Sequence, residues 1–362
     1  MLLTVIVFFI TLSVLIFVHE LGHFWAAKKA GVKVEEFGFG YPPRILGKKI
    51  GETIYSINWI PFGGFVKLYG EELIERRGKP SGIWDRAFWA KSKKARTMVV
   101  LAGVLANFLL AVVAFSIVYS AAGIPTKTDQ VRIVGIAPDS PADRIGLEEG
   151  DIVLKVDNQR LSGLSHFTQL VREKKGEEIK LEIMRTVNDQ QSTINYQLIP
   201  REHPPEKEGP LGVVVSNIEM KKHPFWQMPF RGTIEGFKEA FGWTALIFRS
   251  LGKMIVDLFW QGKVPRDIAG PVGIFQISAG VARSGFLAVL QFIGILSVNL
   301  AVINVLPFPA LDGGRLVFIV YEAITRRRPK PSFERWVNTL GMAILIFLLI
   351  LVTISDLNRL FQ

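Results

Sequence analysis

Two histidines and a glutamate near the N-terminus have the spacing of a metal-dependent hydrolase. His19, Glu20 and His23 form the pattern H-E-x-x-H. On a helix, His19 and His23 are one turn apart, so both imidazoles project from one face and can hold the same metal ion. Glu20 is then placed to act as a general base on a water molecule there. The alternative, a plain helix with scattered polar residues, is costly because the surrounding stretch is apolar.

A catalytic zinc usually has three protein ligands, so the pattern requires one more residue. The chain has no cysteine, which leaves His, Asp or Glu and excludes disulfides, iron–sulfur clusters and thiol catalysis. Asp312 is the best candidate, because Pro307 and Pro309 break the apolar run before it and let the chain approach the histidines. The alternative is a solvated carboxylate at a helix end. The remaining histidines lie in a region predicted to be external: His166, His203 and His223.

Four long apolar stretches must position these residues: 1–27, 98–122, 284–311 and 336–356. Each is long enough for a membrane helix of about 20 residues. Residues 1–27 lack the basic start and the cleavage site of a secretory signal, which favours a retained first span. With 49 % hydrophobic residues overall, the chain is not disordered. The predicted fold class is therefore a polytopic α-helical membrane protein with four transmembrane helices.

The charges between these stretches predict the orientation of the chain. Residues 24–97 contain 15 Lys and Arg against 7 Asp and Glu, and residues 312–335 contain 6 against 3. Residues 123–285 are nearly balanced, with 21 against 20. The positive-inside rule therefore places 24–97 and the loop 312–335 in the cytoplasm, and both termini and 123–285 outside. Because topology explains most of the net charge of +11, we expect a lipid bilayer and no nucleic acid as partner.

The regions outside the spans predict further elements. Within 28–97, residues 48–68 alternate like a re-entrant β-ribbon, and 83–96 pattern as an interfacial amphipathic helix. Residues 223–282 pattern as amphipathic juxtamembrane helices on the outer surface, with packing against a neighbouring domain as the alternative. Residues 127–218 predict a β-rich external domain, with strand-like runs at 131–137, 151–157, 178–185 and 193–199 and a helix over 164–174.

These motifs carry a family resemblance over nearly the whole chain. H-E-x-x-H in a first span, followed far downstream by N-x-x-P-x-P-x-L-D-G-G at 304–314, resembles the site-2 protease family of intramembrane zinc metalloproteases (peptidase family M50). The bacterial RseP/RasP branch is the most similar. Further matches are Phe37–Gly40, Pro61–Gly64 and Gly270–Gly273. In the second span Gly103 and Asn107 match, whereas Val104 stands where the family often has proline.

The resemblance implies a zinc metalloendopeptidase of class EC 3.4.24 in a bacterial inner membrane. His19, His23 and Asp312 would be the ligands of one Zn²⁺ per chain, and Glu20 the catalytic base. The substrates would be membrane-spanning proteins, in this branch anti-sigma factors and signal-peptide remnants cleaved in regulated intramembrane proteolysis.

The resemblance also implies where the substrate would bind. Asn304, Pro307 and Pro309 would contact the unwound segment, and Gly63 and Gly64 would mark a ribbon edge to which that segment adds as a strand.

Within the external region, Gly135–Ala142 and Gly146–Asp151 resemble one bacterial PDZ domain, inserted between the second and third spans. Gly209, Leu211 and Gly212 would belong to its carboxylate-binding loop and capture a peptide terminus. The alternative is a size filter with an unused groove. A PDZ-bearing membrane scaffold and a transporter are the rival functions. The intact H-E-x-x-H and Asp312 disfavour the scaffold, and the lack of a visible inverted repeat disfavours the transporter.

Overall fold

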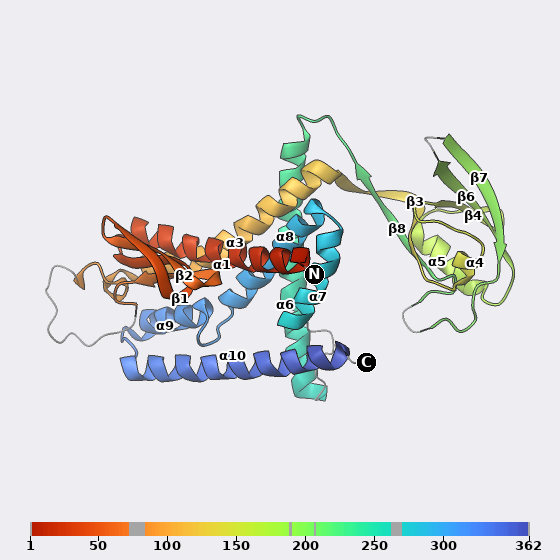
Figure 1. Ribbon diagram of the computed structural model, residues 1–362. Helices are drawn as coiled ribbons and strands as arrows, with labels where there is room; N and C mark the ends of the chain where they lie inside the picture. The colour runs from red at the N-terminus through yellow and green to blue at the C-terminus, as the bar shows by residue number, and fades with distance from the viewer. Residues whose placement is uncertain (1, 72–83, 188–189, 206–207, 262–269, 361–362) are drawn as a thin grey trace. The chain divides into compact units, whose positions relative to one another are not determined.

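The computed structural model describes residues 2–71, 84–187, 190–205, 208–261 and 270–360 (Figure 1). The chain divides into two compact units. One unit combines residues 1–122 with 224–362 and contains the H-E-x-x-H motif and Asp312. The other is formed by residues 123–223.

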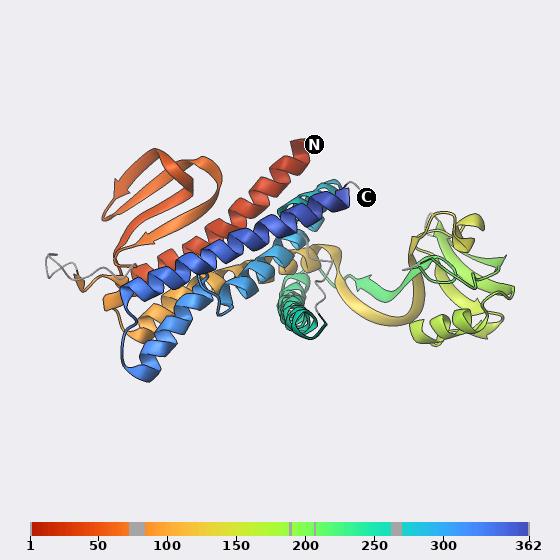
Figure 2. The same ribbon diagram turned by 90° about the horizontal axis from the view of Figure 1, so that it is seen from below.

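Four helices are long and apolar enough to cross a membrane, as predicted: α1 (Leu2–Lys29), α3 (Lys93–Ala122), α8 (Phe286–Val305) and α10 (Pro331–Leu360). Helix α3 packs against both α1 and α8 (Figures 1 and 2). Many of their apolar side chains remain exposed on the protein surface, as expected for helices that face lipid. The chain is a multi-pass membrane protein.

The end of the third predicted span differs from the prediction. Helix α8 ends at Val305, so residues 306–311 are outside it, and Asp312 begins a new helix, α9 (Asp312–Thr325). The connecting segment predicted over 312–335 therefore contains a helix. Two prolines in 306–311 prevent the helix from continuing. The sequence of α9 then presents an apolar face, on which Phe318 and Ile319 are buried.

The β-ribbon extends further than the predicted residues 48–68. It comprises β1 (Val34–Ile50) and β2 (Thr53–Leu68), joined by a turn at Gly51 and Glu52. Both strands fold back, so residues 36–39 pair with 64–67 on one side and with 54–57 on the other. Residues 64–68 therefore form one edge of this small sheet, and β2 packs against α1 (Figure 2).

The expected interfacial helix over 83–96 is wrong for the residues described there. A short 3₁₀ turn, η1 (Phe88–Ala90), precedes α3, and the Ser92 hydroxyl accepts a hydrogen bond from Ala95 N at the start of that helix. The reason lies in the aromatic residues. Phe88 and Trp89 are only 1 % and 2 % exposed, because they fill a core between α1, α3 and the ribbon instead of facing lipid.

Two helices follow the unit of residues 123–223: α6 (Met228–Gln261) and α7 (Pro271–Arg283). Helix α6 packs on α3, where Gly232 and Gly236 face Ser120 and Ser116 so closely that an added Cβ would collide. Such small residues four apart let helix backbones approach within a membrane. Placement of these helices on the outer membrane surface stays a prediction.

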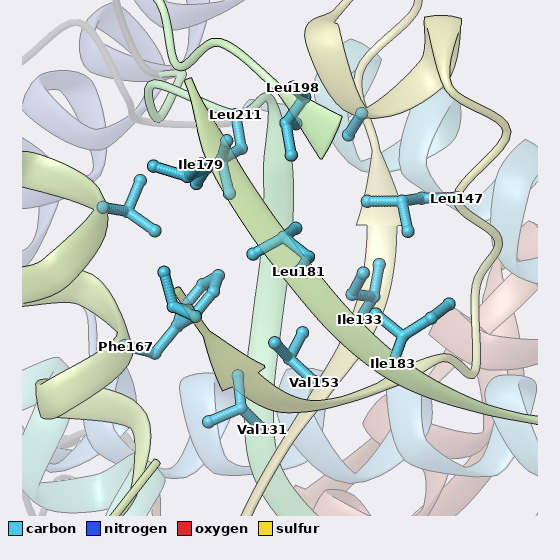
Figure 3. Close-up of a cluster of buried hydrophobic side chains, with 13 residues drawn as sticks. Val131, Ile133, Leu147, Val153, Phe167, Ile179, Leu181, Ile183, Leu198 and Leu211 are labelled. Carbon is cyan, nitrogen blue, oxygen red and sulfur yellow. The ribbon is translucent and has the colours of Figure 1, made fainter. Parts of the chain in front are cut away.

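Residues 123–223 fold around their own hydrophobic core (Figure 3). The sheet has the strand order β7-β6-β4-β3-β8, with β5 paired to β4. Its elements are β3 (Ile124–Ile136), α4 (Pro141–Arg144), β4 (Ile152–Val156), β5 (Gln159–Arg160), α5 (Leu164–Glu173), β6 (Ile179–Val187), β7 (Gln190–Leu198) and β8 (Val213–Lys221). The four expected strands and the helix are present, and β8 was not expected.

In the proposed carboxylate-binding loop, the Leu211 side chain is 2 % exposed and belongs to the core, so only its backbone is left to contact a peptide terminus. Gly212 N donates to Gly209 O at 3.0 Å, which closes the loop as a turn. Gly209 and Gly212 are the first and last residues of this turn. Recognition of a peptide terminus by a PDZ domain stays a prediction.

Candidate metal centre

Three side chains from two distant segments meet inside the unit formed by residues 1–122 and 224–362. His19 and His23 are both buried on one face of α1, and Asp312 is the first residue of α9. Asp312 Oδ2 is 3.0 Å from His19 Nε2 and 3.2 Å from His23 Nε2, and the two Nε2 atoms are 3.1 Å apart. Among the described residues, this is the one group of three potential metal ligands found.

Each histidine is held through its other ring nitrogen by α3. His23 Nδ1 is 2.8 Å from the carbonyl oxygen of Val99, so Nδ1–H donates and Nε2 is left unprotonated. His19 Nδ1 is 3.3 Å from the side-chain amide of Asn107, whose backbone oxygen accepts from the Ser297 hydroxyl. The Asn107 atom at this distance is Nδ2. Turning the amide by 180° brings Oδ1 to His19, so that Nδ1–H can donate to it and leave Nε2 free. Both histidines can therefore present Nε2 to one metal ion.

A glycine on α3 makes room for both imidazoles. A Cβ added at Gly103 would collide with the His23 ring and would lie 2.9 Å from Cε1 of His19. Any larger residue would push the rings out of their present positions. This close contact gives Gly103 a role in shaping the centre.

Asp312 reaches the histidines because its helix starts very close to the end of α8. A Cβ at Gly313 would collide with the carbonyl oxygens of Val305 and Leu306, so only glycine fits this crossing. Asp312 is mostly buried, and its Oδ2 faces the Nε2 atoms of both histidines. A carboxylate in this position can act as a third ligand.

Glu20 lies beside this group in a cavity of about 210 Å³. Its Oε2 accepts a hydrogen bond of 3.1 Å from Val66 N, on the ribbon edge formed by residues 64–68. The Val66 N–H therefore points away from β1 and toward the centre. The strand edge, the Glu20 carboxylate and the three potential ligands all line one cavity.

The substrate-binding residues proposed from the sequence are not among the described residues that line this cavity. Asn304 is half-buried at the end of α8. Pro307 and Pro309 line a different cavity of about 720 Å³ beside α9. Gly63 and Gly64 are buried in β2, where an added Cβ at Gly63 would contact Ile16 of α1.

The donor atoms fit a zinc ion. Two imidazole nitrogens and a carboxylate oxygen are ordinary zinc ligands, and donors about 2.0–2.1 Å from a tetrahedral zinc are separated by about 3.3 Å. The observed separations of 3.0–3.2 Å are close to this value. Oδ2 of Asp312 is buried and has no hydrogen-bond partner, which is costly without a cation.

Sequence reasoning assigned no role at the centre to the residues that support the ligands, Val99, Gly103 and Asn107, although Gly103 and Asn107 matched the family pattern. A lone amide within the uncharged stretch 98–122 was the available signal for Asn107, because a polar side chain inside a span needs a partner. His23 is held by the backbone carbonyl of Val99, and no side chain in the sequence could have indicated this contact.

The chain is similar to known peptidases over most of its length. Residues 7–348 match the family model of Peptidase family M50. A Clostridium perfringens protein whose name calls it a zinc metalloprotease is 34 % identical, covering 95 % of this chain and 96 % of its own. The zinc metalloprotease RasP of Geobacillus kaustophilus is 29 % identical, covering 99 % and 98 %. The Bacillus subtilis regulator of sigma-W protease RasP is 26 % identical, covering 99 % of each chain.

Among solved structures, the PDZ domain of an SdrC-like protein from Listeria monocytogenes covers 25 % of this chain at 20 % identity, with a TM-score of 0.20 that is too low to support a conclusion. The family match, in contrast, covers most of the chain and confirms the predicted membership and the prediction of a peptidase. This chain belongs to peptidase family M50.

Proposed function

We propose that this chain is an intramembrane zinc endopeptidase that cleaves the transmembrane segments of membrane proteins. The observation that carries the proposal is the triangle of His19, His23 and Asp312, with ligand atoms within 4.8 Å of one another, beside Glu20 in one cavity. Relatives named as zinc metalloproteases support zinc as the ion. By chemistry and family, one Zn²⁺ would be held by these three residues.

A bound zinc would supply Lewis acidity, which lowers the pKa of water and polarises a peptide carbonyl. The protein supplies the proton transfer. Glu20 would take a proton from the attacking water and pass it to the leaving nitrogen as the C–N bond breaks, giving a carboxylate and an amine. Glu20 is kept in place by its hydrogen bond from Val66 N.

A substrate helix must unwind before its peptide bonds can be attacked, because they are hydrogen-bonded within the helix. The edge at residues 64–68 would receive the unwound segment as an added strand, with Asn304 and the proline-containing segment 306–311 on the other side. Signal-peptide remnants and anti-sigma factors are the substrate classes that the family suggests. The name of the Bacillus subtilis relative supports a role in sigma-factor regulation.

The proposal is tested by pairing zinc content with cleavage. We expect wild type and Glu20→Gln, purified in detergent, each to hold about one zinc, and only wild type to cleave a single-span substrate. Absence of bound zinc from wild type would contradict the ligand assignment, and equal cleavage by both proteins would contradict the role of Glu20.

The ribbon is tested separately with two glycines of the same sheet that both have positive φ angles, 81° at Gly63 and 62° at Gly51. Gly63 faces α1, whereas Gly51 has open space around it. We expect Gly63→Leu to lower cleavage without loss of zinc, and Gly51→Leu to keep both. Full cleavage by Gly63→Leu would remove the ribbon from the mechanism.

A further inference from the structure

A second, larger cavity adjoins the one that contains the candidate metal centre. Its volume is about 1130 Å³, compared with about 210 Å³ for the smaller cavity. Five residues line both cavities and so form the boundary between them: Leu68, Glu71, Ala310, Leu311 and Arg315. Two of the five are charged, and they are paired with each other.

The pair joins the end of the ribbon to α9. Arg315 Nη1 contacts Glu71 Oε1, and the second carboxylate oxygen of Glu71 accepts a hydrogen bond of 3.3 Å from Leu68 N. Arg315 follows Asp312 by three residues on α9, so the two side chains lie on the same face of the helix. The side chains of Arg315 and Glu71 are 38 % and 24 % exposed. Their ion pair is therefore accessible, and either partner can be exchanged for another charged group.

Hydrolysis of a peptide bond would create a carboxylate in the smaller cavity, where negative charge already predominates. Glu20, Glu71 and Asp312 line it, and Arg315 is the one Lys or Arg among its described lining residues. A guanidinium binds a carboxylate through two parallel N–H bonds and stays charged at any working pH. We propose that Arg315 binds the new C-terminal carboxylate of the cleaved polypeptide, in exchange for Glu71. This inference rests on the proposed protease function.

The larger cavity is suited to hold the polar end of a released chain. Glu334 of α10 lines it and is only 9 % exposed, yet its Oε2 has no hydrogen-bond partner. A buried oxygen of this kind can be satisfied by water or by the backbone N–H groups of a polypeptide in the cavity, but not by lipid chains. Exchange at Arg315 would thus pass the product carboxylate from the metal centre toward this space.

The test compares binding of a dye-labelled apolar nonapeptide with a free C-terminal carboxylate and of the same peptide with a C-terminal amide. The full chain is used in detergent after zinc removal, because zinc would itself bind a carboxylate. We expect the metal-free wild type to prefer the acid about tenfold by fluorescence anisotropy, as for a hydrogen-bonded charge pair. Arg315→Gln should abolish this preference. Arg335→Gln, at another arginine of the larger cavity, should keep it.

Glu71→Gln provides an independent test in the opposite direction. Removal of the competing carboxylate should increase the acid preference above that of wild type, and this variant decides the question if Arg315→Gln fails to fold. Equal binding of acid and amide by wild type, an unchanged preference in Arg315→Gln, or no increase in Glu71→Gln would overturn the inference. If zinc-loaded wild type cleaves nothing but the acid preference is present, the protease function fails and the carboxylate site remains.

Discussion

At the scale of single residues, the metal centre depends on groups that never touch the metal. His23 is oriented by a backbone carbonyl and His19 by an amide from the same helix, α3. These contacts decide which ring nitrogen is free to bind a metal, so they act on affinity through the histidines.

The amide of Asn107 should set the zinc affinity. We expect Asn107→Leu to weaken zinc binding about 10- to 100-fold, because His19 loses the partner of Nδ1. Competition with a chelator of known affinity measures the change. Asn299→Leu is the matched control, since the Asn299 amide bonds Ile295 O within its own helix. Equal affinities of wild type and Asn107→Leu would contradict the positioning role.

The space at Gly103 should be essential for zinc binding. Gly103→Ala places a methyl group against both imidazoles, so we expect well under one zinc per chain in a folded protein. Gly252→Ala serves as the control, because a Cβ at Gly252 meets no other atom within 4 Å. We expect it to keep one zinc. Normal zinc content in Gly103→Ala would show that the rings can move away without loss of the site.

At the scale of elements, a buried ion pair joins the helix that supports the histidines to the helix that carries Asp312. Arg96 of α3 is 1 % exposed, and its Nη2 is 2.7 Å from Oε2 of Glu322 on α9. The Arg96 guanidinium also stacks on the Trp89 ring, 4.6 Å from its centroid. This contact fixes α9 against α3 and so supports the position of Asp312.

Loss of this pair should destabilise the protein. We expect Glu322→Gln to lower the free energy of unfolding by about 3 kcal/mol, because Arg96 remains buried without its anion. Glu235→Gln, which breaks a pair with the exposed Lys238, should cost less than about 0.5 kcal/mol. Denaturant titration in detergent measures both. Equal effects of the two substitutions would show that the buried pair does not stabilise the fold.

The same pair predicts the direction of the pH dependence. Burial acts to raise the pKa of Glu322, but Arg96 and Arg328 outweigh it and hold the pKa below its usual range. A carboxyl group with a lowered pKa in the folded state stabilises the fold at neutral pH. We expect this contribution to be lost as the pH falls through that lowered pKa, and the wild type to approach Glu322→Gln in acid. An increase in the difference between them at low pH would contradict this.

What the sequence could predict depended on how local each signal is. H-E-x-x-H is a four-residue spacing on one helix, and the four spans are long uninterrupted apolar runs. Both the motif and the spans could therefore be predicted from the sequence. The contact of Asn107 with His19 spans 88 positions, and the fold-back of the ribbon pairs residues 36–39 with two separate segments. No periodicity indicates such contacts. The interfacial helix failed because amphipathic composition cannot distinguish a membrane surface from the core that buries Phe88 and Trp89.

At the scale of the whole molecule, the charge distribution predicts which parts face the cytoplasm. The chain has no cysteine, so single cysteines can report the topology without background. We expect Glu149→Cys, in the unit 123–223, to react with a membrane-impermeant maleimide on intact cells from which any outer envelope has been removed. Lys48→Cys, at the ribbon, should react only after permeabilisation. Both positions are exposed on the protein surface, and the reverse pattern would contradict the predicted orientation.

The central claim is that zinc-dependent hydrolysis occurs within an apolar segment of the substrate. The most direct test removes the metal from wild type with a chelator, restores one equivalent of zinc, and maps the cut sites in a single-span substrate by mass spectrometry. We predict no cleavage without metal, recovery with zinc, and a cut inside the apolar segment. Cleavage that persists without metal, or a cut confined to the polar regions outside that segment, would contradict the account.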